Sequence, residues 1–386
     1  VSTATRPQGF WRRASLASYR AGNPSWEILL DMGALNTDRE TKAQWKQARC
    51  LAPDMSRCLV FLTGGKPAEA TVLEFDSSSK TLVDGGFHAG PEVAQADWID
   101  ADTLIVSMQS VAGRDRKVRR EIRLWSRGGK LSDARVVLEG EATDASLMPI
   151  VAHDGEGAPH AFFVRQKVDG SSQLISVDAE GRPLRVSVPD GSRFHGMLGD
   201  ELVFSLPRDW RSGGQSYPAG SIISLSLKAY IDNRGALPRI RTVFAPDEQS
   251  TISAVSMTRD AMYVSLLENV QGRIREFAFD GQHWTSRRLT LPDFGSVEVI
   301  SASDTAKDML VRYSSFLVPD RVYALSKGAE PAQLAELSPR FNASGAEVAQ
   351  YDAVSKDGTK IPYFVVRKVG TATVPPTPVP TLLYAY

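Results

Sequence analysis

The chain is short of cysteine, of long apolar runs and of net charge, and each shortage excludes a class of protein. Its 386 residues contain two cysteines, and 45 lysines and arginines balance 45 aspartates and glutamates. A formal net charge of zero argues against a general role on nucleic acid or at a membrane surface, where a basic excess supplies the affinity. The apolar runs are shorter than the roughly 18 residues that a membrane-spanning helix requires. We therefore expect a globular protein with neither nucleic acid nor a membrane as partner.

The two cysteines, Cys50 and Cys58, flank a predicted turn at 52–54, so they are expected to face each other across a hairpin. A disulfide would form there in an oxidising compartment, but two small buried thiols in adjacent strands are the favoured interpretation. Their spacing is not that of a metal site. Residues 1–5 lack an initiator methionine and the apolar stretch of a signal peptide, so we expect a trimmed front and leave the compartment open.

Short runs of β-branched and aromatic residues recur along the chain, and each ends at Gly, Pro, Asp or Asn. Alternation at period two is typical of half-buried strands. Long amphipathic helical patterns are nearly absent, and only 132–134 and 229–233 suggest short helical turns. The sequence therefore predicts an all-β fold, whose clearest strands are 57–62, 71–75, 103–107, 161–164, 201–205, 222–227, 261–266 and 309–313.

These strands form a loose repeat of about 45–50 residues, which is the length of a four-stranded propeller blade. Similar units begin near Asp97, His195 and Ala254. The stretch from Gly9 to about Leu337 leaves room for seven blades, and each blade would bury its faces only against its neighbours. An array of β-sandwiches is the alternative, but it would not favour so regular a period.

The composition changes near residue 338, which divides the chain into 1–337 and 338–386. A strand at 348–355, an Asp-Gly turn at 357–358 and a strand at 360–366 predict a hairpin. A proline-rich stretch at 374–380 follows as a loop. The apolar, aromatic run 381–386 then predicts a buried strand. Because such a strand would need cover and hydrogen-bond partners, we expect more protein after Tyr386.

Other candidate sites each have a simpler explanation that we favour. The five histidines are not at metal-binding spacings, so turn or surface positions are expected for them. A basic run could bind an acidic peptide end or line a domain interface, but a solvated loop is favoured. The turn-rich loop 209–214 could face a central cavity, and aromatic packing beside a turn is as good an explanation. Gly64-Gly65-Lys66 lacks the spacing of a phosphate loop and is rejected. The histidines are His88, His153, His160, His195 and His283, and the basic run comprises Arg114, Arg116, Lys117, Arg119, Arg120 and Arg123.

The tail resembles the domain junction of the prolyl oligopeptidase family of serine peptidases, in a bacterial branch. Residues 355–366 are similar to the hairpin that enters the α/β-hydrolase domain of that family, and 380–386 to the strand that runs into its Tyr-Gly-Gly-Phe loop. Ala385 stands where the family has Gly. The rest of the chain is similar to the family's seven-bladed propeller, most clearly at 15–20, 26–31, 98–104, 209–210, 217–221 and 316–320.

This resemblance implies a seven-bladed β-propeller over 1–337, followed at 338–386 by the first strands of an α/β-hydrolase domain. It implies a monomer without cofactor or metal, found in the cytoplasm or the bacterial periplasm, whose hydrolase domain cuts short peptides after proline. The propeller would exclude folded proteins and water. The nucleophile elbow Gly-x-Ser-x-Gly does not occur in these residues. One family site residue matches: Tyr386 would donate its hydroxyl to the oxyanion.

Two functional hypotheses follow. In the first, the chain is the gating portion of a proline-specific serine peptidase, inactive alone, whose partners are the hydrolase domain and short proline-containing peptides. In the second, it is a stand-alone propeller that binds peptides or proteins. The hairpin at 348–366 and the strand at 381–386 favour the first, because a stand-alone propeller has no use for them.

Overall fold

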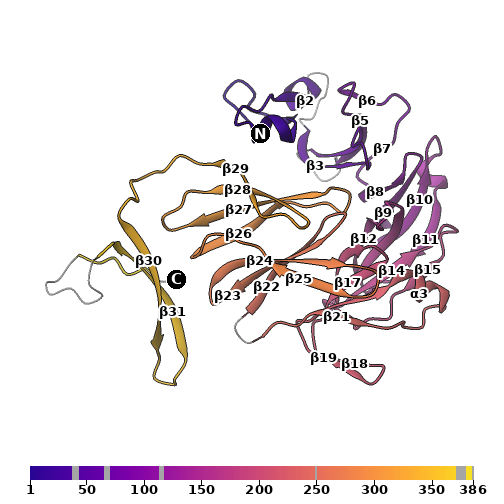
Figure 1. Ribbon diagram of the computed structural model, residues 1–386. Coiled ribbons are helices and arrows are strands. Elements are labelled where there is room, and N and C mark those ends of the chain that lie inside the picture. Colours follow the sequence, from indigo (N-terminus) through magenta and orange to yellow (C-terminus); the bar gives the residue numbers. More distant parts are fainter. Residues whose placement is uncertain (37–42, 65–69, 113–116, 248–249, 371–379, 385–386) are drawn as a thin grey trace.

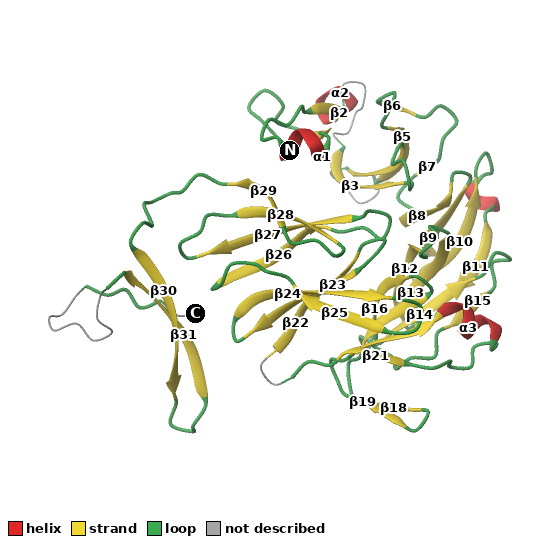
Figure 2. Cartoon of the chain, viewed as in Figure 1, coloured by secondary structure: helices red, strands yellow, loops and turns green. Residues whose placement is uncertain are grey.

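The computed structural model describes residues 1–36, 43–64, 70–112, 117–247, 250–370 and 380–384, and this part is almost entirely β. Figure 2 shows long antiparallel strands with a few short helices at their ends. The all-β prediction is therefore confirmed. No helix in the described ranges has the length and apolar character that crossing a membrane requires.

Six sheets of four or five strands follow one another along the chain, and each is an antiparallel meander of consecutive strands (Figure 1). The first sheet contains β3 (Gln44–Cys50), β4 (Arg57–Thr63), β5 (Thr71–Asp76) and β6 (Thr81–Leu82), with β7 (His88–Ala89) also on β5. The second contains β8 (Val93–Asp100), β9 (Thr103–Ala112), β10 (Lys117–Ser126) and β11 (Arg135–Glu139). The third contains β12 (Asp144–His153), β13 (Pro159–Lys167), β14 (Ser172–Val177) and β15 (Pro183–Arg185).

The remaining three sheets repeat the same order. The fourth contains β16 (Arg193–Leu198), β17 (Glu201–Ser205), β20 (Ile222–Ser226) and β21 (Arg241–Phe244), and the hairpin β18 (Trp210–Ser212) and β19 (Gln215–Tyr217) is inserted in it. The fifth contains β22 (Ser250–Met257), β23 (Met262–Glu268), β24 (Gln271–Phe279) and β25 (Trp284–Arg288). The sixth contains β26 (Gly295–Ser301), β27 (Asp308–Ser315), β28 (Arg321–Ser326) and β29 (Ala332–Glu336).

The hydrophobic core is divided into clusters that lie between consecutive sheets. Leu59 of the first sheet packs with Trp98 and Leu104 of the second, and similar clusters join each later pair. The second strand of a sheet is covered by a neighbour on both faces, so it is a continuous apolar run rather than an alternating one; Cys58–Leu62 of β4 is buried throughout. This arrangement of sheet against sheet is that of propeller blades.

A smaller, two-stranded sheet lies between the first and sixth sheets. It contains β1 (Phe10–Arg13) and β2 (Glu27–Asp31), with α1 (Leu16–Arg20) between them and α2 (Met32–Leu35) after them. Trp11 packs its ring against Trp45 and Phe75 of the first sheet, while Arg20 pairs with Asp308 of the sixth. Six larger sheets and this pair therefore complete the circuit seen in the described part of Figure 1.

The helical turns predicted at 132–134 and 229–233 are confirmed as the 3-10 turn Leu131–Asp133 and α3 (Leu227–Asp232). The helix α1 was not predicted. Its five residues are too few to show a helical period, and its start is fixed by Ser15, whose hydroxyl accepts the Ser18 N–H at 3.1 Å.

The tail is partly as predicted. The hairpin is confirmed as β30 (Ala346–Val354) and β31 (Lys360–Lys368). The strand predicted at 381–386 is wrong for its described part, because 380–384 belong to no sheet and Leu382 is 92% exposed. An extended apolar run becomes a strand only when a neighbour supplies a hydrogen-bond ladder. Residues 385–386 lie outside the described ranges.

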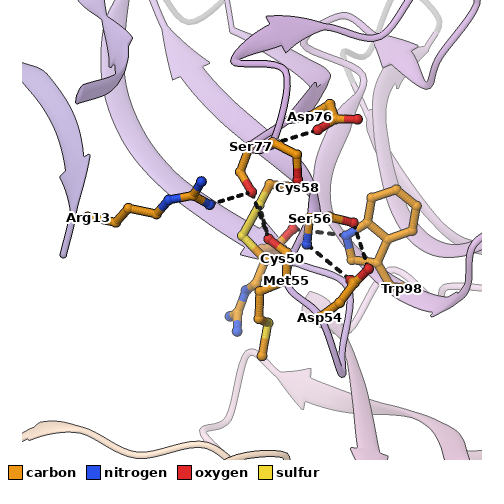
Figure 3. Close-up of a disulfide and its surroundings, with 11 residues drawn as sticks. Arg13, Cys50, Asp54, Met55, Ser56, Cys58, Asp76, Ser77 and Trp98 are labelled. Carbon is orange, nitrogen blue, oxygen red and sulfur yellow. Dashed lines mark hydrogen bonds between the residues drawn. A yellow bond between two sulfur atoms is a disulfide. The ribbon is translucent and has the colours of Figure 1, made fainter. Parts of the chain in front are cut away.

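The two cysteines form a disulfide, so the preference for free thiols was wrong (Figure 3). The predicted hairpin does form, and Cys50 of β3 lies directly opposite Cys58 of β4 in its register. That register sets their Cα atoms 3.9 Å apart and brings the two sulfur atoms together. The turn between them is held by Ser77, whose hydroxyl donates to the Met55 carbonyl at 3.1 Å.

Candidate functional site: the two faces of the ring

The order of the strands defines two faces of the ring. In the first five sheets the first strand is innermost, since β3 contacts β8, β8 contacts β12, β12 contacts β16, and β16 contacts β22. We call the face where β29 ends and the chain leaves for β30 the exit face. Antiparallel pairing then puts every turn between second and third strands on the exit face. Every turn between first and second strands lies on the opposite one, the far face.

The first strand of each of the six sheets contains at least one β-bulge, which inserts an unpaired residue into that strand. Five of the seven bulges fall near the exit-face end of their strand, and the other two, the second bulge of β8 and the bulge of β26, fall near the far face. Bulges increase strand twist and re-aim side chains, and they recur next to functional sites. The extra residues are Lys46, Ala94, Ile99, Ala145, His195, Ser253 and Ile300.

His195 is the bulge residue of the fourth sheet. Its Nε2 lies 3.0 Å from the Ser205 hydroxyl. Burial, assisted by the charge of Arg193, lowers the pKa of His195 to about 4, so the ring is neutral at physiological pH. A neutral imidazole can donate one hydrogen bond and accept another without adding a charge.

The exit face carries the hairpin of β30 and β31. Gln350 of β30 accepts from the Gln271 side chain at 2.7 Å and donates to the Asn269 carbonyl at 3.0 Å, and both partners lie at the turn between β23 and β24. Phe364 of β31 packs against Phe294 and Phe316, with ring centroids 6.2 and 5.4 Å away. All these contacts are with turns or strand ends of the exit face, so the hairpin is fixed over that face.

An apolar surface surrounds this attachment. A groove of about 310 Å³ lies between the turn after β27 and the segment that leads to β30. It is lined by Phe316, Leu337 and Phe341, each half exposed or more. The hairpin also exposes Ile361 and Tyr363. Monomeric proteins rarely leave a contiguous apolar patch of this kind uncovered, so this surface is suited to a partner.

One of the loops singled out from the sequence lies on the same face. The loop 209–214 forms the hairpin of β18 and β19, and Trp210 packs on Tyr217 with ring centroids 5.6 Å apart. Aromatic packing is therefore what the structure shows for Trp210. The basic run is not a loop from Lys117 onward but the strand β10, so that part of the prediction was wrong. The alternating sequence 117–126 pairs with β9 over its whole length. Arg114 and Arg116 lie outside the described ranges, as do Gly65 and Lys66 of the rejected phosphate loop.

The far face carries a polar cluster that the sequence analysis did not single out. His153 ends β12 of the third sheet, and its backbone N–H donates to Asp304 Oδ2 at 2.8 Å. Its Nδ1 lies 3.2 Å from the same oxygen. Asp97 of β8 accepts from the Val151 N–H at 3.2 Å, close by. His153 and Asp304 are 151 positions apart, and the sequence shows no motif that connects them.

The other histidines do not meet at one place. His160 pairs with Asp154 of its own hairpin at 3.0 Å, and His283 is exposed beside Asp280. His88 lies in the short strand β7. Among the described residues, no three or more His, Cys, Asp or Glu side chains are grouped so that they could hold a metal ion. Tyr386, the matched oxyanion residue, lies outside the described ranges, so its role stays a prediction.

Comparison with known proteins finds similarity to peptidases and to one family of propeller domains. Residues 218–335 match the model of the prolyl oligopeptidase N-terminal β-propeller domain. The chain is 28% identical to an uncharacterized peptidase of Sinorhizobium fredii over 99% of the chain and 53% of that protein. It is 23% identical to an uncharacterized peptidase of Rickettsia prowazekii, over 98% of the chain and 54% of that protein.

A solved structure of a post-proline cleaving enzyme from Rickettsia typhi superposes with a TM-score of 0.80 at 21% identity. The match covers 96% of this chain and 56% of that enzyme. Oligopeptidase B from Leishmania major superposes with a TM-score of 0.64 at 13% identity, over 92% of this chain and 49% of that one. The present chain thus spans about half the length of the proteins that it matches.

The chain is a β-propeller of the kind that stands at the N-terminus of certain peptidases. Over residues 218–335 it is similar to the N-terminal propeller domain of the prolyl oligopeptidase family, and over its whole length to about half of two uncharacterized peptidases.

Proposed function

We propose that this propeller is the substrate-gating portion of a serine peptidase that hydrolyses short peptides after proline. The observation that carries the proposal is the hairpin of β30 and β31. It is fixed over the exit face by Gln350 and Phe364, while Ile361 and Tyr363 remain exposed on it. A peptidase domain that begins with this hairpin would cover the exit face and enclose the space beside the ring axis.

The physical task of such a propeller is size filtering. A chamber closed by a rigid ring admits a flexible peptide and rejects a folded domain, and it keeps water from the acyl group during catalysis. We further infer that the ring has seven blade positions, six of them filled by the larger sheets and the seventh by β1 and β2. The contacts of Trp11 with the first sheet and of Arg20 with the sixth support this count.

We also propose the finer roles that the resemblance implies. Tyr386 donates its hydroxyl to the oxyanion of the tetrahedral intermediate. The Ser-Asp-His triad lies in the hydrolase domain, so residues 1–386 alone are inactive. Neither a cofactor nor a metal takes part, and the enzyme works as a monomer. The similarity to a post-proline cleaving enzyme supports proline as the residue before the cut.

The reading frame after Tyr386 tests this proposal. It is expected to continue with Gly-Gly-Phe and to encode a Gly-x-Ser-x-Gly motif further on. A stop codon directly after Tyr386 would leave the hairpin without a domain and would favour the alternative, a stand-alone propeller that binds peptides or proteins.

A further inference from the structure

The third and sixth sheets lie on opposite sides of the ring. The third has the second and fourth sheets as neighbours, while the sixth lies beside the fifth and the two-stranded sheet. Two sheets therefore separate them on one side, and three separate them on the other (Figure 1). A direct contact between the third and sixth sheets must cross the axis of the ring.

His153 and Asp304 make that contact. Asp304 lies in the turn between β26 and β27, and one of its oxygens receives the His153 N–H at 2.8 Å and faces His153 Nδ1 at 3.2 Å. Both side chains are largely shielded, with 17% and 23% of their surface exposed. Charge-assisted hydrogen bonds of this kind are stronger than neutral ones.

Neighbouring far-face turns also approach one another. The Arg259 N–H donates to the Ala306 carbonyl at 2.8 Å, which joins the turns of the fifth and sixth sheets. A Cβ built on Gly155 of the third sheet would lie 3.2 Å from the Cα of Gly199 in the fourth. The far ends of the blades therefore converge, in contrast to the exit face with its long loops and attached hairpin.

We propose that His153 and Asp304 form a latch across the axis, which closes the far mouth of the ring so that peptides reach the chamber from the exit face. The role in substrate access rests on the proposed peptidase function, whereas the latch itself does not. In this proposal His153 and Asp304 are positioning residues. They determine the route by which a peptide enters and take no part in the chemistry.

The charges around His153 make the latch sensitive to pH. The hydrogen bond to Asp304 and the negative charges of Asp304, Asp97 and Asp154 raise the pKa of His153 above 6.5, although partial burial opposes them. Arg49 of β3 offsets part of the charge on Asp97, and His160 pairs with Asp154. Because the folded-state pKa is raised, the stabilisation is complete below pH 6.5. It is lost as the pH rises through the folded-state value.

Hydrogen exchange on the chain 1–386 tests the latch, with the turn 302–307 of the sixth sheet as the readout. The variants are His153→Gln and Asp304→Ala, and the matched control is His160→Gln, which removes a histidine–aspartate pair within one hairpin. At pH 6, His153→Gln and Asp304→Ala are expected to speed exchange in 302–307 by about tenfold, as the loss of a charged hydrogen bond implies. His160→Gln should leave it unchanged.

The His153→Gln effect should be smaller at pH 8.5 than at pH 6, because the positive charge on wild-type His153 declines as the pH rises through its folded-state pKa. The proposal is overturned if 302–307 exchanges at the wild-type rate in both latch variants, or if His160→Gln has the same effect. If the Asp304→Ala chain fails to fold, His153→Gln becomes the deciding variant. That variant keeps the hydrogen bond from the backbone N–H of residue 153 to Asp304. Failure of the complete protein to cleave after proline would refute the proposed function and leave this exchange result standing.

Discussion

Glu74 of the first sheet and Arg127 of the second form a two-point ion pair that joins neighbouring blades. Arg127 Nη1 and Nη2 lie 2.9 and 3.0 Å from the two carboxylate oxygens of Glu74. The Phe87 N–H and Arg57 also donate to Glu74, whose side chain is fully shielded. A buried carboxylate is stable only when its charge is paired in this way.

The same device recurs between the fifth and sixth sheets. Glu276 lies on the third strand of its sheet, as Glu74 does, and binds Arg287 at 3.0 Å. It also accepts the N–H of Gly328, which lies in the turn after the third strand of the sixth sheet. Arg127 occupies the corresponding turn of the second sheet. Equivalent positions of the repeat thus hold a glutamate that fastens the next blade.

Removing Arg127 should therefore destabilise the ring strongly. Arg127→Ala leaves the Glu74 charge buried with fewer partners, and breaking a buried pair costs about 3–5 kcal/mol. Urea unfolding, monitored by tryptophan fluorescence, measures the loss of stability as a lower urea concentration at the midpoint. The matched control is Arg182→Ala, whose ion pairs with Asp178 and Glu180 are exposed to solvent and should contribute little to stability. Equal losses in the two variants would contradict the assignment.

Glu74 should also make the chain sensitive to acid. Burial raises the pKa of Glu74, but the hydrogen bonds and charge of Arg127 outweigh it and hold that pKa below 4.5. Because the folded-state pKa is lowered, the stabilisation is present above pH 4.5 and is lost as the pH falls through the folded-state value. Glu74→Gln, which cannot ionise, should be less stable than wild type at pH 7, and the difference should shrink as the pH falls below 4.5 and through the folded-state pKa. A constant difference across this range would show that Glu74 is not charged in the fold.

More of the fold than of the sites could be predicted from the sequence. Alternating runs such as 103–107 and 261–266 depend on local chemistry, and they became strands in blade-like sheets. The pairing of Cys50 with Cys58 depends on register, which only the closed hairpin fixes. Glu74 with Arg127, and His153 with Asp304, depend on how separate blades meet around the ring. No local spacing encodes these contacts, so they could be found only once the blades were in place.

The disulfide gives a chemical test of the hairpin. The chain unfolded in guanidinium without reductant should show no reactive thiol, and two after reduction. Replacing both Cys50 and Cys58 by Ser should lower stability by about 2–3 kcal/mol, the loop entropy of so short a crosslink. Thiol titration with a coloured disulfide reagent measures the first effect and urea unfolding the second. Two free thiols before reduction would restore the interpretation as buried cysteines.

The effects on stability of substitutions at Gly295 and Tyr313 should depend on each other. A Cβ at Gly295 would overlap the buried Tyr313 ring, whose hydroxyl donates to the Asp293 carbonyl at 2.8 Å. Gly295→Ala should cost about 1–3 kcal/mol or more through overpacking. In the background of Tyr313→Leu the same change should cost much less, because the ring is gone. Thermal unfolding of the four proteins gives the coupling, and strict additivity would contradict the contact.

The proposed role of Tyr386 as the oxyanion donor can be tested by enzyme kinetics. In the complete protein, Tyr386→Phe removes the proposed oxyanion donor and should lower kcat by about 10²–10³, with little change in KM. Tyr384→Phe is the matched control, two positions earlier in the same segment, and should retain activity. Steady-state kinetics on a Gly-Pro chromogenic amide measures both. An unchanged kcat in Tyr386→Phe would remove this residue from the oxyanion site.

The most direct test of the whole account is cleavage of the Gly-Pro chromogenic amide by the complete protein and by residues 1–386 alone. We predict cleavage after proline by the complete protein. We predict none by the propeller portion, and none after the serine of the Gly-x-Ser-x-Gly motif is changed to alanine. Cleavage that persists in the alanine variant, or a complete protein that cleaves no proline-containing peptide, would contradict the account.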